Sequence, residues 1–129
     1  FTRQGLTDQL PGQSARDWPN TFRAARTIPA VAYLQASRAR TQLLTEMEQT
    51  LREIDVMVAP TGGGSTLVAT NLTGHPTYVL PVGARKDQGG RPTVLQLVGR
   101  LDGEAAVLTL AEAWQADTRW HLARPELVR

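Results

Sequence analysis

The stretch Asp55-Val56-Met57-Val58-Ala59-Pro60 decides the fold that we expect for this chain. Before it, apolar residues recur at every third or fourth position, whereas within it they run continuously until the proline. A short continuous apolar run closed by a proline is typical of a strand that is covered on both faces. The sequence therefore predicts that a helix gives way to a buried strand here, as in an α/β protein.

The residues before this strand predict one long helix from Thr27, with Pro29 in the first turn, where its missing N–H costs nothing. Residues 1–28 are interrupted by glycines and prolines, so we expect only short turns there, chiefly at Asn20–Arg26. The long helix carries a single apolar stripe made of Ala32, Ala36, Ala39, Leu43, Met47, Leu51 and Ile54.

The residues after Pro60 predict two more strands, Thr77–Val82 and Thr93–Val98, joined by a polar loop as an antiparallel hairpin. Pro81 cannot donate to a strand ladder, so we expect it at an edge or a bulge. Asp102 is expected to cap a final helix from Gly103 to Asp117. The predicted order is helix, strand, loop, antiparallel hairpin, helix.

These elements expose more apolar surface than they can cover for one another. A strand buried on both faces needs a layer on each side and neighbours at both edges. The chain has 129 residues and begins with Phe1 rather than Met. We therefore expect it to be part of a longer protein and to complete a larger sheet.

The composition excludes several classes of protein. The chain is 41% hydrophobic and 20% charged, which is ordinary for a globular domain, and it contains no apolar run of the ~20 residues that span a bilayer. Its formal net charge of +2 is weak evidence for a polyanionic partner. Without cysteine, disulfides and thiolate nucleophiles are excluded.

A charge-free stretch of 29 residues, Val56 to Ala84, is the most informative local feature. Its middle, Thr61 to His75, is either a buried connection between strands or also the lining of a ligand pocket at the strand ends. Its run Gly62-Gly63-Gly64-Ser65 lacks the lysine of a phosphate-binding loop, and Ser65 is not in a nucleophile elbow.

The remaining polar residues predict structure rather than chemistry. His75 lies between Gly74 and Pro76 and is interpreted as a turn residue that donates to a carbonyl, and Asn71 is expected to cap a short helix ended by Gly74. No carboxylate stands at metal-ligand spacing from either histidine, so we predict no metal site and no catalytic residue. Among the remaining residues, we expect His121 to be partly exposed and Lys86 to be solvated at the surface. Four arginines are expected either on a solvated face or in internal ion pairs: Arg23, Arg26, Arg38 and Arg40.

The chain resembles the C-terminal part of the amidase signature family. The resemblance rests on the order and spacing of several short pieces over nearly the whole chain. These are Trp18-Pro19-Asn20-Thr21-Phe22-Arg23, Ile28 to Ala36 with Arg38 and Arg40, Asp55 to Thr61, Asn71-Leu72-Thr73-Gly74-His75-Pro76, Leu80-Pro81-Val82-Gly83, Pro92-Thr93 with Leu95 to Arg100, and Gly103-Glu104.

The resemblance implies one large α/β domain with a mixed sheet flanked by helices, of which residues 1–129 would be the C-terminal segment. It also implies amide hydrolysis through a serine acyl-enzyme, with a second serine, a lysine and an oxyanion hole that all lie upstream. No cofactor is implied. For this segment it implies a substrate-pocket wall near Thr61, Asn71, Gly74 and His75, which would supply shape rather than chemistry.

Three functions remain open at this point. The first is a segment of an amidase acting on a small-molecule amide, whose partner is the upstream catalytic part of the same protein. The second is an amidotransferase subunit that releases ammonia from glutamine for tRNA-dependent amidation, the one case in which a nucleic acid is involved. The third is a free-standing, non-catalytic α/β assembly module. We expect a cytoplasmic protein, no membrane partner, and self-association through uncovered apolar surface.

Overall fold

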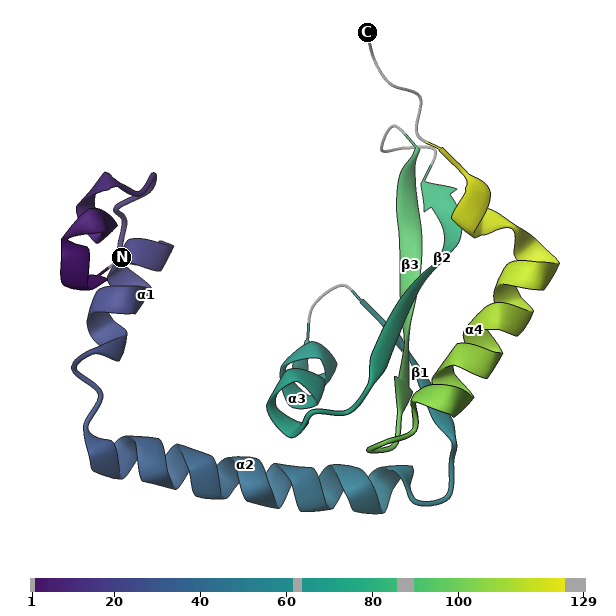
Figure 1. The fold of residues 1–129 in the computed structure, drawn as a ribbon, viewed down its shortest axis with the longest axis horizontal. Coiled ribbons are helices and arrows are strands. Elements are labelled where there is room, and N and C mark those ends of the chain that lie inside the picture. Colours follow the sequence, from purple (N-terminus) through teal and green to yellow (C-terminus); the bar gives the residue numbers. More distant parts are fainter. Residues whose placement is uncertain (1, 62–63, 86–89, 125–129) are drawn as a thin grey trace, which may run out of the picture. The chain divides into compact units, whose positions relative to one another are not determined.

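The computed structural model describes residues 2–61, 64–85 and 90–124, and its α/β elements are drawn in Figure 1. The chain divides into two compact units, Phe1–Ala39 and Arg40–Arg129. The predicted fold class is confirmed, because helices flank a three-stranded antiparallel sheet in the second unit. Each unit is described separately below.

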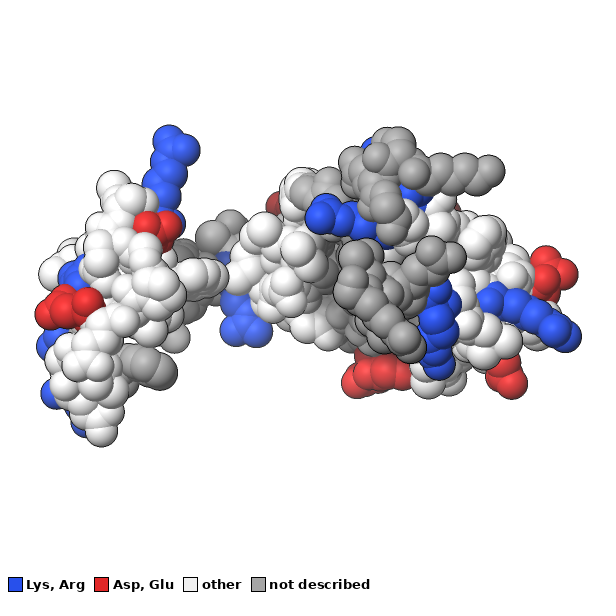
Figure 2. Space-filling model, turned by 90° about the horizontal axis from the view of Figure 1, so that it is seen from above, with Lys and Arg blue, Asp and Glu red and all other residues white. Residues whose placement is uncertain are grey.

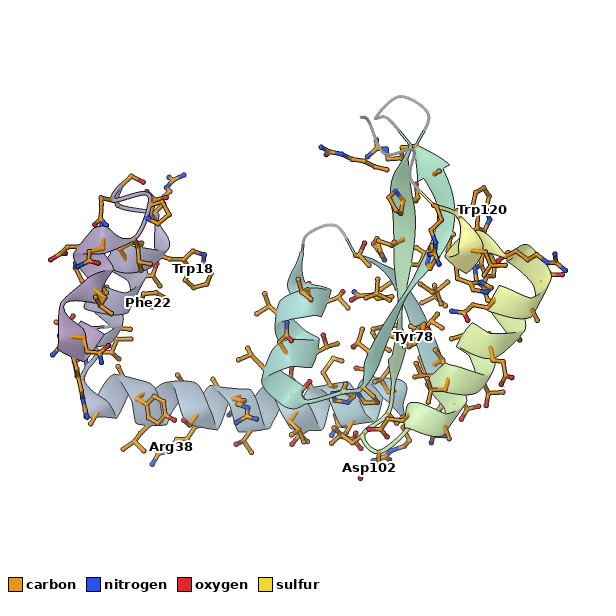
Figure 3. The ribbon with its side chains drawn as sticks, turned by 45° about the horizontal axis from the view of Figure 1, so that its top comes forward. Trp18, Phe22, Arg38, Tyr78, Asp102 and Trp120 are labelled. Carbon is orange, nitrogen blue, oxygen red and sulfur yellow. The ribbon has the colours of Figure 1, made fainter. Side chains whose placement is uncertain are left out.

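The first unit contains two short 3-10 helices, Thr2–Gln4 and Leu6–Gln9, and helix α1, Trp18–Ala25. Helix α1 begins two residues before the predicted start, since Pro19 fits in its first turn. Trp18 and Phe22 lie one helical turn apart, as Figure 3 shows. The centroids of their rings are 5.7 Å from each other.

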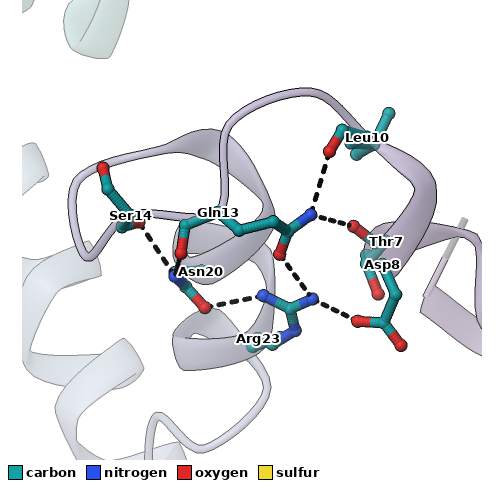
Figure 4. Close-up of polar contacts among 7 residues, drawn as sticks. All are labelled: Thr7, Asp8, Leu10, Gln13, Ser14, Asn20 and Arg23. Atoms are coloured by element: carbon teal, nitrogen blue, oxygen red, sulfur yellow. Dashed lines mark hydrogen bonds and ion pairs between the residues drawn. The ribbon is translucent and has the colours of Figure 1, made fainter.

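Polar side chains hold the loop before α1 in place (Figure 4). The Asn20 amide donates to the carbonyl oxygens of Gln13 and Ser14 at 3.0 and 2.8 Å. Arg23 donates to Asn20 Oδ1 at 2.6 Å and to Gln13 Oε1 at 3.0 Å, and it also pairs with Asp8. Of the two interpretations of this arginine, the structure therefore shows the internal ion pair.

Helix α2, Ala30–Leu51, is the predicted long helix, but it begins three residues later than predicted. Pro29 precedes the helix instead of lying in its first turn, and its carbonyl accepts the N–H groups of Ala32 and Tyr33. Its apolar stripe is buried only at the C-terminal end, where Leu51 is 1% exposed. The alanines of the first half are exposed, and the helix ends before Ile54. The extension of the stripe to Ile54 was therefore wrong.

The sheet contains β1, Val56–Pro60, β2, Thr77–Arg85, and β3, Arg91–Gly99, in the order β1-β3-β2. All neighbours are antiparallel, which confirms the predicted hairpin. The register of β2 shifts between Pro81 and Gly83, so the proline lies on an edge strand and next to a bulge, as predicted. The predicted position of Lys86 lies outside the described residues.

Helix α4, Glu104–Thr118, packs on one face of β2 and β3. The apolar core on this face consists of Leu80, Leu97, Val107 and Ala111. Gln96 and Val98, the neighbours of Leu97 along β3, point to the opposite face of the sheet, because successive side chains of a strand alternate between its faces. Helix α3, Ser65–Thr73, lies on that face (Figure 1). Gln96 and Val98 are 1% and 0% exposed.

Two local predictions were wrong. Strand β1 is not covered on both faces, because Val58 is 56% exposed. The physical reason is that β1 is an edge strand and α4 packs over the other two strands. Asp102 is not the cap of α4: it adopts a left-handed conformation with φ 57°, and Gly103 occupies the N-cap position (Figure 3 labels Asp102).

Candidate functional site

Thr61 follows β1 and is tied to the middle strand. Its hydroxyl donates to the Val94 carbonyl at 3.3 Å, and one residue earlier the Pro60 carbonyl accepts the Gln96 side-chain amide at 3.2 Å. Both contacts join the end of β1 to β3. They fix where the chain leaves the sheet toward the charge-free connection.

The described part of that connection forms helix α3, which ends at Gly74. The glycine has φ 82°, and its N–H donates to the Thr70 carbonyl at 2.9 Å. The predicted short helix ended by Gly74 is therefore confirmed. Asn71 is exposed and lies in the last turn of this helix rather than at its N-terminal cap.

His75 has a side chain that is 0% exposed. Its Nδ1 lies 2.7 Å from the Thr73 hydroxyl, which itself donates to the Ala69 carbonyl at 2.8 Å. Which of the two groups donates in the contact with Nδ1 depends on the tautomer of the imidazole. His75 therefore lies in a turn, as predicted, and its partner there is a hydroxyl instead of a carbonyl.

Glu48 of α2 lies on the other side of the imidazole. Its Oε1 is 3.4 Å from His75 Nε2, and both atoms are buried without a hydrogen-bond partner. A formed charge-assisted hydrogen bond would measure about 2.7–2.9 Å. The contact is longer than that, and the Glu48 side chain as a whole is 44% exposed.

Thr73, His75 and Glu48 form a hydroxyl–imidazole–carboxylate row, yet this row is not built for nucleophilic catalysis. Thr73 is 3% exposed, and its proton is committed to the Ala69 carbonyl. Ser65, at the start of α3, is exposed, and the described residues place no imidazole, carboxylate or amine within hydrogen-bonding distance of its hydroxyl. A nucleophile, a base and an orienting group are not assembled in these ranges.

The structure brings together only part of the predicted site. Asn71, Gly74 and His75 are neighbours at the junction of α3 and β2, whereas no recorded contact joins them to Thr61 within the described ranges. A hollow of about 340 Å³ lies elsewhere, in the first unit, lined by Ala15, Asn20, Thr21, Ala24, Ala25 and Ile28. It coincides with none of the predicted site residues.

Glu48, Thr73 and Gln96 were missed by the sequence-based predictions, although each makes a buried contact around the candidate residues. Glu48 directly follows Met47 of the apolar stripe and stands one turn before Leu51. A charged residue on the flank of a buried stripe is a signal for a buried partner. The identity of that partner could not be read from the spacing.

Arg38 and Arg40, expected on a solvated face or in internal ion pairs, have different surroundings. Arg40 donates to the Leu72 carbonyl at the end of α3, and Arg38 is exposed and points away from α2 (Figure 3). On the face seen in Figure 2, acidic and basic side chains are interspersed within each unit. His121 is partly exposed, as predicted.

Neither a metal centre nor a membrane span is found in the described residues. No cluster of three or more histidine, aspartate or glutamate side chains there could hold a metal ion. Among the helices in those ranges, none is both long and apolar enough to cross a bilayer.

The chain is similar to curated proteins that are named as subunits of glutamyl-tRNA(Gln) amidotransferase. It is 31% identical to the subunit of Trichormus variabilis over 114 residues, 33% identical to that of Synechococcus elongatus over 114 residues, and 31% identical to that of Chloroflexus aurantiacus over 115 residues. Each match covers 74% of this chain and 23% of the relative. No family model matches the chain. No solved structure matches it either.

The chain thus spans about a quarter of the length of these relatives, and the matched quarter is their C-terminal part. The relatives are amidase signature proteins. This agrees with the short sequence pieces that carry the resemblance, and with an α/β structure whose sheet has exposed apolar residues at both edges, Val58 and Val79. The chain belongs to the amidase signature family.

Proposed function

We propose that this chain is the C-terminal part of an amide-hydrolysing enzyme, in which it supports the sheet and forms one wall of the substrate pocket. The similarity to amidotransferase subunits over 74% of the chain carries this proposal. In this family a serine, a second serine and a lysine upstream would perform the chemistry, so this segment would supply shape.

We assign the pocket wall to the residues at the two ends of the charge-free connection, Thr61, Asn71, Gly74 and His75. Asn71 and Gly74 are exposed at the end of α3 and can contact a ligand. The His75 ring faces inward, so it acts by fixing the position of Gly74 and Pro76. Thr61 is held by Val94 at the start of the connection.

The relatives favour a second, more specific function. They are named as amidotransferase subunits, so the complete protein would release ammonia from glutamine for tRNA-dependent amidation and would require other subunits. The alternative is an amidase that acts on a small carboxamide and needs only its own upstream part. In either case we propose the cytoplasm as the compartment.

A chimeric protein tests the proposal. The matched C-terminal quarter of the Trichormus variabilis subunit is replaced by this chain, and ammonia release is measured from glutamine and from simple carboxamides. We expect the truncated subunit to be inactive and the chimera to release ammonia. Release from glutamine alone supports the amidotransferase function, and release from simple amides supports the amidase.

The chain alone provides the matching control. Without upstream residues it should hydrolyse none of these amides above background. Turnover by the isolated chain that is lost in Ser65→Ala would contradict the proposal. A folded but inactive chimera, together with a monomeric chain that unfolds cooperatively, would instead favour the free-standing assembly module.

A further inference from the structure

The C-terminal end of α3 has a carbonyl group that the helix itself cannot satisfy. In a continuing helix the Leu72 carbonyl would accept the N–H of residue 76, but that residue is Pro76, which has no N–H. The helix ends here instead, and the Gly74 N–H donates to the Thr70 carbonyl. The Leu72 carbonyl therefore depends on water or on a donor from another element.

Arg40 of α2 supplies this donor, because its Nε–H group donates to the Leu72 carbonyl. A cation is favourable at this place, since the last carbonyl groups of a helix carry partial negative charge. Helix α3 has no ionisable side chain of its own. The charge at its C-terminal end thus comes from a different helix.

The guanidinium group of Arg40 is not claimed by its own helix. The residues three and four positions away on α2 are Ala36, Ser37, Leu43 and Leu44. No carboxylate at helical spacing therefore competes with the Leu72 carbonyl for this side chain.

Helix α2 also contacts the turn that follows α3. Two turns beyond Arg40, Glu48 Oε1 lies 3.4 Å from Nε2 of His75. Asn71 directly precedes Leu72, and Gly74 lies between Leu72 and His75. The contacts made by α2 thus lie next to the two exposed residues that we assign to the pocket wall.

We infer that Arg40 is a positioning residue of this pocket wall: by holding the Leu72 carbonyl, it fixes the end of α3 and with it Asn71 and Gly74. The inference rests on the proposed function, because it takes these two residues to contact the amide substrate. Arg40 acts through Leu72, and the reacting groups of the proposed enzyme lie upstream. Loss of Arg40 should therefore weaken substrate binding and leave the chemical step largely intact.

The first experiment measures this contact independently of activity. In the complete protein, with its upstream part in place, amide hydrogen exchange of residues 70–76 is followed by mass spectrometry. Arg40→Ala should raise the exchange rate of this segment by a factor of about three to ten, because a charge-assisted hydrogen bond at an exposed site is lost. An unchanged rate would overturn the inference.

Arg38→Ala is the matched control, because it removes the same side chain two positions earlier on the same helix. Arg38 is exposed and points away from α2 (Figure 3). Its neighbours at helical spacing are also uncharged: Leu34, Gln35, Thr41 and Gln42. Exchange of residues 70–76 should stay unchanged in this variant. An equal increase in both variants would show that the contact with Leu72 is not the cause, and would overturn the inference.

The second experiment separates KM from kcat for ammonia release by the complete protein from glutamine and from simple carboxamides. In Arg40→Ala we expect KM to rise about three- to tenfold, while kcat stays within about twofold of the unmutated protein. Arg40→Lys retains a charged donor and should recover part of the lost affinity. A lower kcat with unchanged KM would contradict the positioning role.

Failure of this inference and failure of the proposed function give different results. If the unmutated protein releases ammonia but Arg40→Ala has the same KM as Arg38→Ala, the inference alone is wrong. If the unmutated protein hydrolyses no amide, the proposed function is wrong. Arg40 then has no substrate to position, even where the exchange experiment shows that it holds the end of α3.

Discussion

The side-chain amide of Gln96 donates to the carbonyl oxygen of Pro60 at 3.2 Å, and Gln96 is 1% exposed. A glutamine from the middle strand thereby holds the last residue of edge strand β1. The buried partner in this contact is the Gln96 amide, whereas Pro60 itself is exposed, so removing the amide costs one hydrogen bond and leaves the carbonyl open to water.

Gln96→Leu should consequently lower the free energy of unfolding by about 0.5–1.5 kcal/mol, the net contribution of one hydrogen bond. Denaturant-induced unfolding followed by circular dichroism measures this change. Gln49→Leu, on the exposed side of α2, is the control and should have little effect. Equal stability of Gln96→Leu and the unmutated chain would show that the Pro60 contact is not important for stability.

The left-handed conformation of Gly74 predicts a backbone effect. A Cβ at this position would meet no atom within 4 Å, so any loss in Gly74→Ala comes from φ 82° alone. We expect a loss of roughly 1–2 kcal/mol in the free energy of unfolding. Gly83→Ala also has open space, without a positive φ, and should not destabilise the chain. Similar losses in both variants would contradict this explanation.

Two valines of the sheet differ in burial, so we expect their substitution by alanine to lower the free energy of unfolding by different amounts. Val98 is 0% exposed on β3, whereas Val58 is 56% exposed on β1. Val98→Ala should cost about 2 kcal/mol through lost burial and a small cavity. Val58→Ala should cost less than about 0.5 kcal/mol in the isolated chain. Urea titrations of the two variants give the comparison, and a reversed order would mean that β1 is covered in solution.

Asp17 predicts a pH effect in the first unit. Hydrogen bonds from the Ser14 side chain and, second, from the Ser14 backbone N–H hold the pKa of Asp17 below its ordinary value. The sign follows from linkage: the contact stabilises the fold above the unfolded pKa, ~3.9, and this contribution is lost as pH falls through the lower folded pKa.

The measurement is a ¹³C titration of the Asp17 carboxyl group. Ser14→Ala removes the first cause and keeps the backbone N–H, so the pKa of Asp17 should rise part of the way toward its ordinary value. Ser65→Ala, an exposed serine in the second unit, should leave the titration of Asp17 unchanged. An unchanged midpoint in Ser14→Ala would show that the hydroxyl does not matter.

The local pattern of the sequence was sufficient to predict most of the helices and strands. The apolar run before Pro60, the hairpin and the bulge at Pro81 were all predicted, since each depends on neighbouring residues. The strand order was not, because the central position of β3 results from pairing between distant segments. The exposure of Val58 follows from that order and could not be read from its neighbours.

At the candidate site, too, local features could be predicted from the sequence, whereas contacts between distant segments could not. Gly74 as a helix end could be predicted from residue type, because glycine accepts a positive φ. The contact between Glu48 and His75 could not, since it joins a helix to a turn far along the chain. Asp102 was assigned as a cap from its type, yet the tight turn after β3 places it in a left-handed conformation and leaves Gly103 at the cap.

The placement of β3 between β1 and β2 also has a consequence for synthesis and truncation. Of these three strands β1 is made first, and its partner among the described residues is β3, so during translation this pairing must wait until the ribosome has released Gly99. Until then its apolar residues lack a neighbour and are open to association with other chains. A gene product that stops before Arg91 would contain β1 and β2, which do not pair with one another in the finished sheet, and would lack the strand between them.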